Sequence, residues 1–138
     1  MSHTSLALTL ALGATLALPH AADAFSGKKN TRVNPVNDKV FEVIIKNSSR
    51  STDYWCGAAD YARRGLGADW RARIYIARTR GQSVTTNRRS AVHFTLDPAS
   101  APGADQIGII RFGQLQQGDS MSVQQAHQYC TEPVPRNL

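Results

Sequence analysis

Two cysteines, Cys56 and Cys130, constrain the fold of this chain more than any other feature, because they are its only cysteines and lie far apart. A bond between them closes a loop of about 75 residues, and a chain-entropy treatment gives such a crosslink about 4 kcal/mol of stabilisation. An even number of cysteines in an exported chain is normally oxidised in pairs. We therefore predict one disulfide, with a free or intermolecular thiol as the alternative.

The first 24 residues have the layout of a secretory signal peptide. An apolar run of 14 residues extends from Ser5 to Leu18, Pro19 follows it, and small residues stand at Ala22 and Ala24. A helix that crosses a bilayer needs about 20 apolar residues, so this run is too short for a membrane anchor. We predict cleavage after Ala24, a periplasmic or secreted protein, and no transmembrane segment in the mature chain.

The charge of the chain favours anionic partners. The sequence has 16 Lys and Arg against 10 Asp and Glu, a formal net charge of +6. Loss of the leader removes one acid, Asp23, and no base, which leaves +7. Such a charge attracts anionic groups, and it also serves solubility alone. The mature length is enough for one domain.

The first part of the mature chain combines a polar segment with an apolar strand. Residues 25–38, FSGKKNTRVNPVND, are polar, basic and turn-rich, and we expect an extended N-terminal arm. Residues 39–46, KVFEVIIK, are rich in β-branched and aromatic side chains and predict a strand. Apolar residues on both faces of this strand indicate a central position in a sheet.

A helix is predicted to begin near Ser51 and to end at Gly65 or Gly67. Four apolar residues at spacings of four, three and four define its buried face: Trp55, Ala59, Ala62 and Leu66.

Two alternating segments follow the helix. Residues 70–78 and 90–97 each place apolar side chains at every second position, which is typical of half-buried strands. We expect them to pair antiparallel and to pack against the helix. The alternating faces also include Trp70, Ala72 and Leu96, and the side chains expected to face the helix are Ile74, Ile76, Val92 and Phe94.

The last segments complete the predicted architecture. Residues 107–113 predict a short strand, and residues 121–130 predict another, with a short helix as the alternative. Residues 131–138 contain two prolines and are expected to form an irregular tail. The predicted fold is α+β, a single domain over residues 39–130 with one main helix on a mostly antiparallel sheet of four to five strands.

Cys56 and His93 suggest one possible reaction chemistry. A thiol at the start of a helix is activated by the helix dipole, and a histidine on a following strand can act as its base. In this order of residues the chain resembles the NlpC/P60 and CHAP groups of cell-wall amidases. The resemblance implies a cysteine hydrolase that acts on cell-wall peptide, with Cys56 as nucleophile and His93 as base. The disulfide is the competing interpretation of Cys56.

Metal and cofactor sites are not expected. His127 and Cys130 form one closely spaced pair of possible ligands, which Cys56 and His93 can complete, but the chain has no second close pair of the kind that marks zinc sites. No glycine-rich phosphate loop occurs after a strand. Among the acids, only Glu42 stands inside an apolar strand, where it either pairs with an arginine or faces solvent.

The clearest candidate for a binding surface is a cluster of arginines with an aromatic neighbour, which we call the arginine strip. Guanidinium groups of this kind bind phosphates, carboxylates and sugars. Anionic partners outside the cytoplasm include lipid headgroups, acidic glycans and acidic proteins, whereas nucleic acid is not expected. The competing interpretation is a solvated strand face. The strip consists of Arg71, Arg73, Tyr75, Arg78, Arg80, Arg88 and Arg89.

These observations favour a binding or structural module over an enzyme. They leave its ligand and oligomeric state open.

Overall fold

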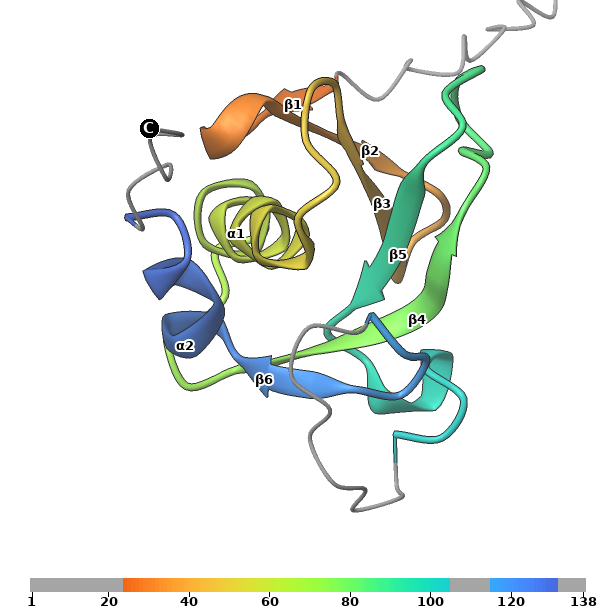
Figure 1. Cartoon of the computed structure of the whole chain (residues 1–138). Helices are drawn as coiled ribbons and strands as arrows, with labels where there is room; N and C mark the ends of the chain where they lie inside the picture. Colours follow the sequence, from red (N-terminus) through yellow and green to blue (C-terminus); the bar gives the residue numbers. More distant parts are fainter. Residues whose placement is uncertain (1–23, 105–114, 132–138) are drawn as a thin grey trace, which may run out of the picture.

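The computed structural model describes residues 24–104 and 115–131. One main helix lies inside a curved antiparallel sheet, and Figure 1 looks along this helix with the sheet bending around it. In chain order the elements are β1 (Phe25–Ser26), the 3₁₀ turn η1 (Lys28–Asn30), β2 (Thr31–Pro35), β3 (Val40–Ile45), α1 (Ser51–Asp60), the π-helical turn η2 (Tyr61–Gly65), β4 (Arg73–Gly81), β5 (Ala91–Thr95), the 3₁₀ turn η3 (Pro98–Ser100), β6 (Ser120–Ser122) and α2 (Val123–Gln128).

The sheet has six strands in the order β1-β2-β3-β5-β4-β6, with all neighbours antiparallel. The α+β fold with a main helix on an antiparallel sheet is confirmed, and the strand count is slightly higher than the predicted four to five. The central position predicted for residues 39–46 is also confirmed, because β3 pairs with β2 on one side and β5 on the other.

The segment expected to be an N-terminal arm contributes two strands to the sheet. β1 pairs with β2, and β2 pairs with β3 over five residues. Thr31 and Val33 are buried, and the Lys28 amide donates to the Asp60 carboxylate at 2.9 Å. The sequence pattern missed these strands because β1 is very short and β2 has only two inward side chains between turn residues.

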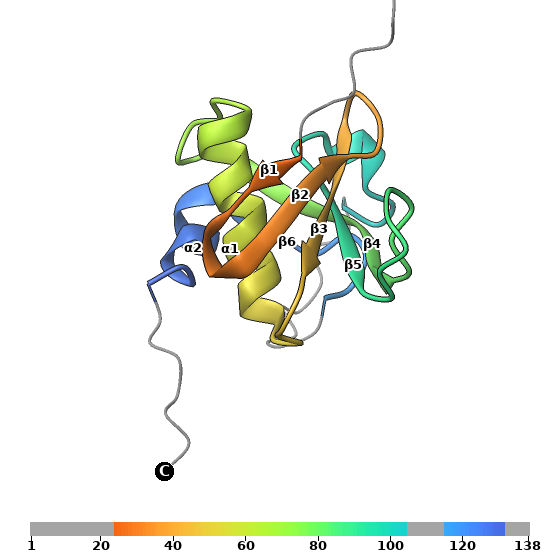
Figure 2. The ribbon, with the colours of Figure 1, turned by 90° about the horizontal axis from the view of Figure 1, so that it is seen from above.

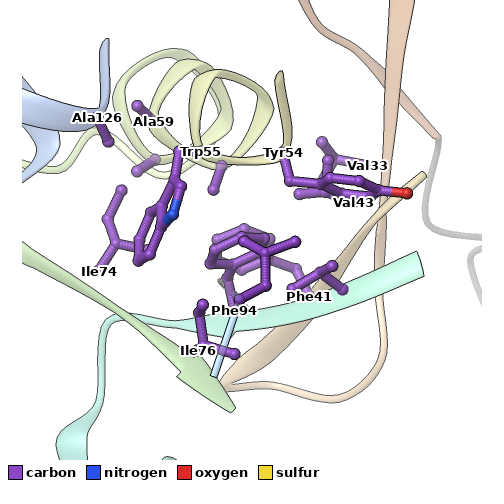
Figure 3. Packing of buried hydrophobic residues seen from close by; sticks show 14 of the residues in the cluster. Val33, Phe41, Val43, Tyr54, Trp55, Ala59, Ile74, Ile76, Phe94 and Ala126 are labelled. Atoms are coloured by element: carbon purple, nitrogen blue, oxygen red, sulfur yellow. The ribbon is translucent and has the colours of Figure 1, made fainter. Parts of the chain in front are cut away.

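The helix packs its predicted face into the core, with one exception. Trp55, Ala59 and Ala62 are buried, and the Trp55 ring meets Phe94 edge to face at 5.1 Å (Figure 3). Leu66 is 48% exposed. The reason is the wider turn η2, which interrupts the 3.6-residue period and rotates the last predicted position away from the sheet.

Gly57 allows the helix to approach the sheet closely. A Cβ at this position would lie 2.8 Å from methyl groups of both Thr31 and Val43. Only glycine has no such atom, so the helix can rest directly on β2 and β3.

The antiparallel pairing of β4 with β5 is confirmed, but its register is irregular. Ile76 faces Phe94, and Arg78 faces His93 two residues further along β4, so one extra residue is inserted there. Gly81 faces Ala91, so a second extra residue is inserted between Arg78 and Gly81. β4 also begins later than predicted. Trp70 precedes it in a turn and is 40% exposed.

The C-terminal part of the described chain combines the two predicted alternatives. Residues 120–122 form β6, and Val123–Gln128 form α2, whose N-cap Ser122 accepts a hydrogen bond from the Gln125 amide. α2 packs against α1.

The strand predicted at 107–113, nearly all of the leader and nearly all of the tail lie outside the described residues. No helix within the described ranges is long and apolar enough to cross a membrane.

Candidate functional site

The predicted disulfide is present. The sulfurs of Cys56 and Cys130 are bonded, with their Cα atoms 4.9 Å apart, and no described cysteine is free. Cys56 is fully buried in α1, and Cys130 follows α2. The bond therefore joins the main helix to the C-terminal helix. A sulfur held in this bond carries no thiolate, the form that attacks a substrate.

The structure does not bring His93 to Cys56. Val92 and Phe94, its neighbours on β5, face the core beneath α1. Since side chains alternate along a strand, His93 lies on the opposite face of the sheet. Its Nε2 atom lies 3.2 Å from Glu42 Oε2.

No metal centre is found in the described part of the chain, where no three His, Cys, Asp or Glu side chains form a group able to hold an ion. His127 instead meets the Trp70 ring edge to face at 5.0 Å.

The most densely bonded polar group is the carboxylate of Glu42, which is fully buried on the sheet face turned away from α1. It accepts hydrogen bonds from the hydroxyls of Ser83 and Thr85. It also accepts from the amides of Val84 and Thr85, both at 3.0 Å. Because a carboxylate only accepts, the nearby His93 Nε2 atom carries a hydrogen toward it. Glu42 thus ties the β4–β5 connection, residues 82–90, to the sheet.

This arrangement differs from both predictions for Glu42, since the acid neither pairs with an arginine nor faces solvent. One sequence signal was available: a single acid in an apolar strand requires partners when it is buried. The hydroxyl-rich SVTT segment at residues 83–86 is such a partner. The lone pairs of the carboxylate are directed at these donors, so the group serves as an anchor for the connection.

The ionisation of the anchor follows from two opposing effects. Burial favours the neutral form of Glu42, but hydrogen bonds from Ser83 and Thr85 and from two amides outweigh it and lower its pKa. Burial and the charge of Arg78 lower the pKa of His93, and the opposing contribution of Glu42 does not reverse the shift. The pair is therefore a neutral imidazole beside a carboxylate at neutral pH.

We expect stability to fall as the solution is acidified. A depressed folded-state pKa contributes stability above the unfolded-state pKa, and that stability is lost as pH falls. The loss of stability due to His93 should begin at about pH 6.5, and that due to Glu42 should begin at about pH 4.5. Urea unfolding at a series of pH values measures the free energy of unfolding and its decline with pH. The His93→Gln variant should show a smaller decline in the upper part of the range, and the remaining decline there is due to His127, whose pKa is also lowered by burial. A decline that is unchanged in His93→Gln would contradict the assignment.

The structure divides the arginine strip among several locations. Arg73 donates to Ser120 on β6. Arg78 lies beside His93 and donates to the Gln82 carbonyl at 2.7 Å. The Arg80 side chain contacts α1 and so lies on the opposite face of the sheet from Arg78. The two side chains differ in this way because the irregular register of β4 interrupts the usual alternation of side chains along the strand. The remaining members are exposed or half-buried: Arg71, Tyr75, Arg88 and Arg89.

Arg80 belongs to a pocket of about 620 Å³ at the N-terminus of α1. Its guanidinium donates to the Ser49 carbonyl at 2.6 Å and lies over the Tyr54 ring, 5.0 Å from the ring centre. Two fixed contacts thus hold this cation in place. The pocket is lined by Ser49, Arg50, Ser51, Thr79, Arg80, Leu115 and Gln116.

The two arginines of the pocket differ in their electrostatic surroundings. Arg50 lies 3.7 Å from the buried carboxylate of Asp53, which offsets part of its charge. No carboxylate of residues 24–104 or 115–131 pairs with Arg80. Arg80 is therefore the principal source of positive potential in the pocket. The N-terminus of α1 adds the positive end of a helix dipole, and the N-cap side chain of Arg50 does not cap it.

Sequence reasoning identified Arg80 but not its surroundings. Ser49, Arg50 and Ser51 stand at the predicted start of the helix, and the long β4 strand brings Thr79 and Arg80 beside them. Comparisons of the chain with models of protein families, with characterised proteins and with solved structures found no match.

Proposed function

We propose that this protein is an exported binding module that holds a small hydrophilic anion, bearing a phosphate or carboxylate group, in the pocket at the N-terminus of α1. Export is proposed from the leader predicted at residues 1–24, and the disulfide is consistent with an oxidising compartment. The observation that carries the anion proposal is Arg80, a cation without an acidic partner among the described residues, held in place inside a pocket.

The composition of the pocket supports an anionic ligand. Three hydroxyl side chains, Ser49, Ser51 and Thr79, line it beside the two guanidinium groups. A guanidinium presents several donors in a planar fork that matches phosphate and carboxylate oxygens. The hydroxyls of Ser49 and Ser51 supply further donors, whereas that of Thr79 already donates to the Leu115 carbonyl. A helix N-terminus also favours negative charge. All of these groups favour an anionic ligand.

The size and polarity of the pocket narrow the ligand class. Its volume of about 620 Å³ lies within the range of small-molecule sites, about 300–1,000 Å³. Leu115 is the only apolar residue of the seven that line it. A pocket with so little apolar surface suits a hydrophilic anion better than an acyl chain or an aromatic ring.

The test is the affinity of the protein and its variants for inorganic phosphate and citrate, measured by titration calorimetry. Arg80→Gln removes the principal charge, and loss of a charged hydrogen bond, worth about 1.5–3 kcal/mol, should weaken binding about tenfold to a hundredfold. Arg89→Gln is the matched control, because it makes the same charge change at an exposed position outside the pocket. It should leave the affinity nearly unchanged.

Two results would contradict the proposal. The first is equal loss of binding in Arg80→Gln and Arg89→Gln, which would assign binding to the overall charge of the arginine strip. The second is no binding of either anion by the unmodified protein. Thermal unfolding of both variants checks that Arg80→Gln, which also loses its contacts with Ser49 and Tyr54, remains folded.

A further inference from the structure

The opposite end of α1 carries two exposed apolar side chains on one short connection. Among the described residues, three large hydrophobic side chains are exposed: Leu66, Trp70 and Val84. Leu66 is 48% and Trp70 40% exposed, and both belong to residues 66–72, which link η2 to β4. We call this link the η2–β4 connection. It lies at the end of α1 remote from the β3–α1 loop (Figure 2).

The connection is held in one conformation by hydrogen bonds to its surroundings. The Ala68 amide donates to the Ala62 carbonyl at 2.8 Å, and the Arg63 guanidinium donates to the Ala68 carbonyl at 2.6 Å. The Trp70 carbonyl accepts from the amide of Gln124 on α2 at 3.0 Å. The exposure of Leu66 and Trp70 is therefore a fixed property of the surface, and presenting them costs little ordering entropy on binding.

A cationic side chain lies over the exposed tryptophan. The Arg63 guanidinium lies over the Trp70 ring, 4.2 Å from its centre, and His127 meets the same ring at its edge. The Arg64 guanidinium lies over the Phe25 ring at 4.7 Å. Both arginines thus pack an aromatic surface with their planar heads. Among the described residues no carboxylate pairs with Arg63, whereas Asp60 offsets part of the charge of Arg64.

The ionisation of His127 shows that these charges share one region. Burial, and next the charge of Lys28, lower its pKa. Arg63 and Arg64 act in the same direction, whereas Asp60 acts against them. The Asp60 carboxylate is buried and bonded to Arg64 at 2.6 Å, so it presents little negative charge to solvent.

We propose that the η2–β4 connection docks the protein on the surface of an anionic lipid bilayer. Leu66 and the exposed part of Trp70 enter the interfacial region, and Arg63 and Arg64 lie against the headgroups. Leucine and tryptophan are favourable at this depth, and neighbouring arginines add attraction to anionic lipids. The acid of the connection itself, Asp69, reduces the local positive charge without removing it.

The small size of the apolar surface favours a bilayer over a protein partner. A stable interface between proteins buries about 1,200–2,000 Å², which two side chains on one connection do not supply. A bilayer accepts a few inserted side chains and adds long-range attraction for the basic residues around them. This inference is independent of the pocket at the other end of α1.

The first experiment is sedimentation of the protein with vesicles. Vesicles of phosphatidylcholine and phosphatidylglycerol in equal parts should bind the protein, and vesicles of phosphatidylcholine alone should bind it about tenfold more weakly or less. The double variant Leu66→Ser with Trp70→Ser should lose about tenfold or more of the binding to anionic vesicles. Val84→Ser is the matched control, since Val84 is the third exposed apolar side chain and should have no effect.

The second experiment leaves the connection unchanged and so remains informative if the double variant is unstable. The chain has two tryptophans, and Trp55 is buried in the core. In the Trp55→Phe protein, Trp70 emission should shift to shorter wavelength on anionic vesicles and be quenched by brominated lipid. In the Trp70→Phe protein, the emission of Trp55 should neither shift in wavelength nor be quenched.

Several outcomes would overturn the inference. They are the absence of binding to anionic vesicles, equal losses in the double variant and Val84→Ser, and binding without quenching of Trp70. A further contrary result is a protein that does not bind vesicles but self-associates, or binds an acidic polysaccharide, through Leu66 and Trp70. That result would assign the connection to another partner. Arg80→Gln should bind vesicles normally, which separates this result from the test of the pocket.

Discussion

Replacement of Glu42 by leucine is expected to lower the free energy of unfolding by about 3–5 kcal/mol, the largest single-residue effect we predict. The carboxylate is fully buried and accepts four hydrogen bonds from Ser83, Val84 and Thr85. Leucine fills a similar volume but accepts none of them. The buried Ser83 hydroxyl and the buried His93 Nε2 then remain without this partner, and each unsatisfied buried donor costs about 1–3 kcal/mol. The part-buried donors of Val84 and Thr85 also lose their acceptor.

Chemical unfolding measures the effect, and hydrogen exchange shows where it arises. The amides of Val84 and Thr85 should lose protection in Glu42→Leu, because both donate to the missing carboxylate. Glu42→Gln is the matched variant. Glutamine has the same shape as glutamate and keeps one of the two acceptor oxygens, while an NH2 group replaces the other. Glu42→Gln should therefore lower the free energy of unfolding by less than Glu42→Leu. A loss below about 1 kcal/mol in Glu42→Leu would show that the connection is held by other contacts.

Removal of the Cys56–Cys130 bond should have the second largest effect, a loss of about 2–4 kcal/mol. The two residues are separated by 74 positions, so the bond restricts a large part of the unfolded chain. It also holds α2 against α1. For a domain of this size, each 1 kcal/mol corresponds to about 4–8 °C in Tm, so a decrease of about 10 °C or more is expected.

The bond is best removed by Cys56→Ala with Cys130→Ala, because Cys56 is fully buried and serine would place an unpaired hydroxyl there. Thermal unfolding with and without a thiol reductant provides the control. Reductant should lower the Tm of the parent protein toward that of the double variant and leave the variant unchanged. Two results would contradict the prediction. One is a Tm of the parent protein that does not change with reductant, and the other is a reaction of the denatured, unreduced protein with a thiol reagent.

The parts of the fold that were predicted correctly have strong local patterns. β3 has apolar side chains on both faces and β5 alternates cleanly, and both lie in the middle of the sheet. The disulfide followed from the cysteine count together with the predicted export. In each case the signal is contained in neighbouring residues or in composition.

The incorrect predictions have specific local causes. Leu66 continues the helical spacing of Trp55 and Ala62, but the π-helical turn η2 rotates it into solvent. Trp70 continues the alternation of β4, but it lies in the turn before that strand. The inserted residue between Arg78 and Gly81 then directs Arg78 and Arg80 to different faces of the sheet. A one-residue change of this kind leaves no mark in a periodic pattern, because the sequence on each side still alternates.

The sequence by itself determined the class of fold, the main helix, the central strands and the pairing of the two cysteines, because these depend on periodicity, composition and count. Only the tertiary structure decided which polar residues meet. Glu42 and Ser83 are 41 positions apart, and Arg80 and the carbonyl of Ser49 are 31 apart. Contacts at such separations depend on strand order, on the register of β4 and on the path of the β4–β5 connection, and a local pattern specifies none of these. The anchor at Glu42, the pocket at Arg80 and the exposed pair Leu66 and Trp70 all arise at this level.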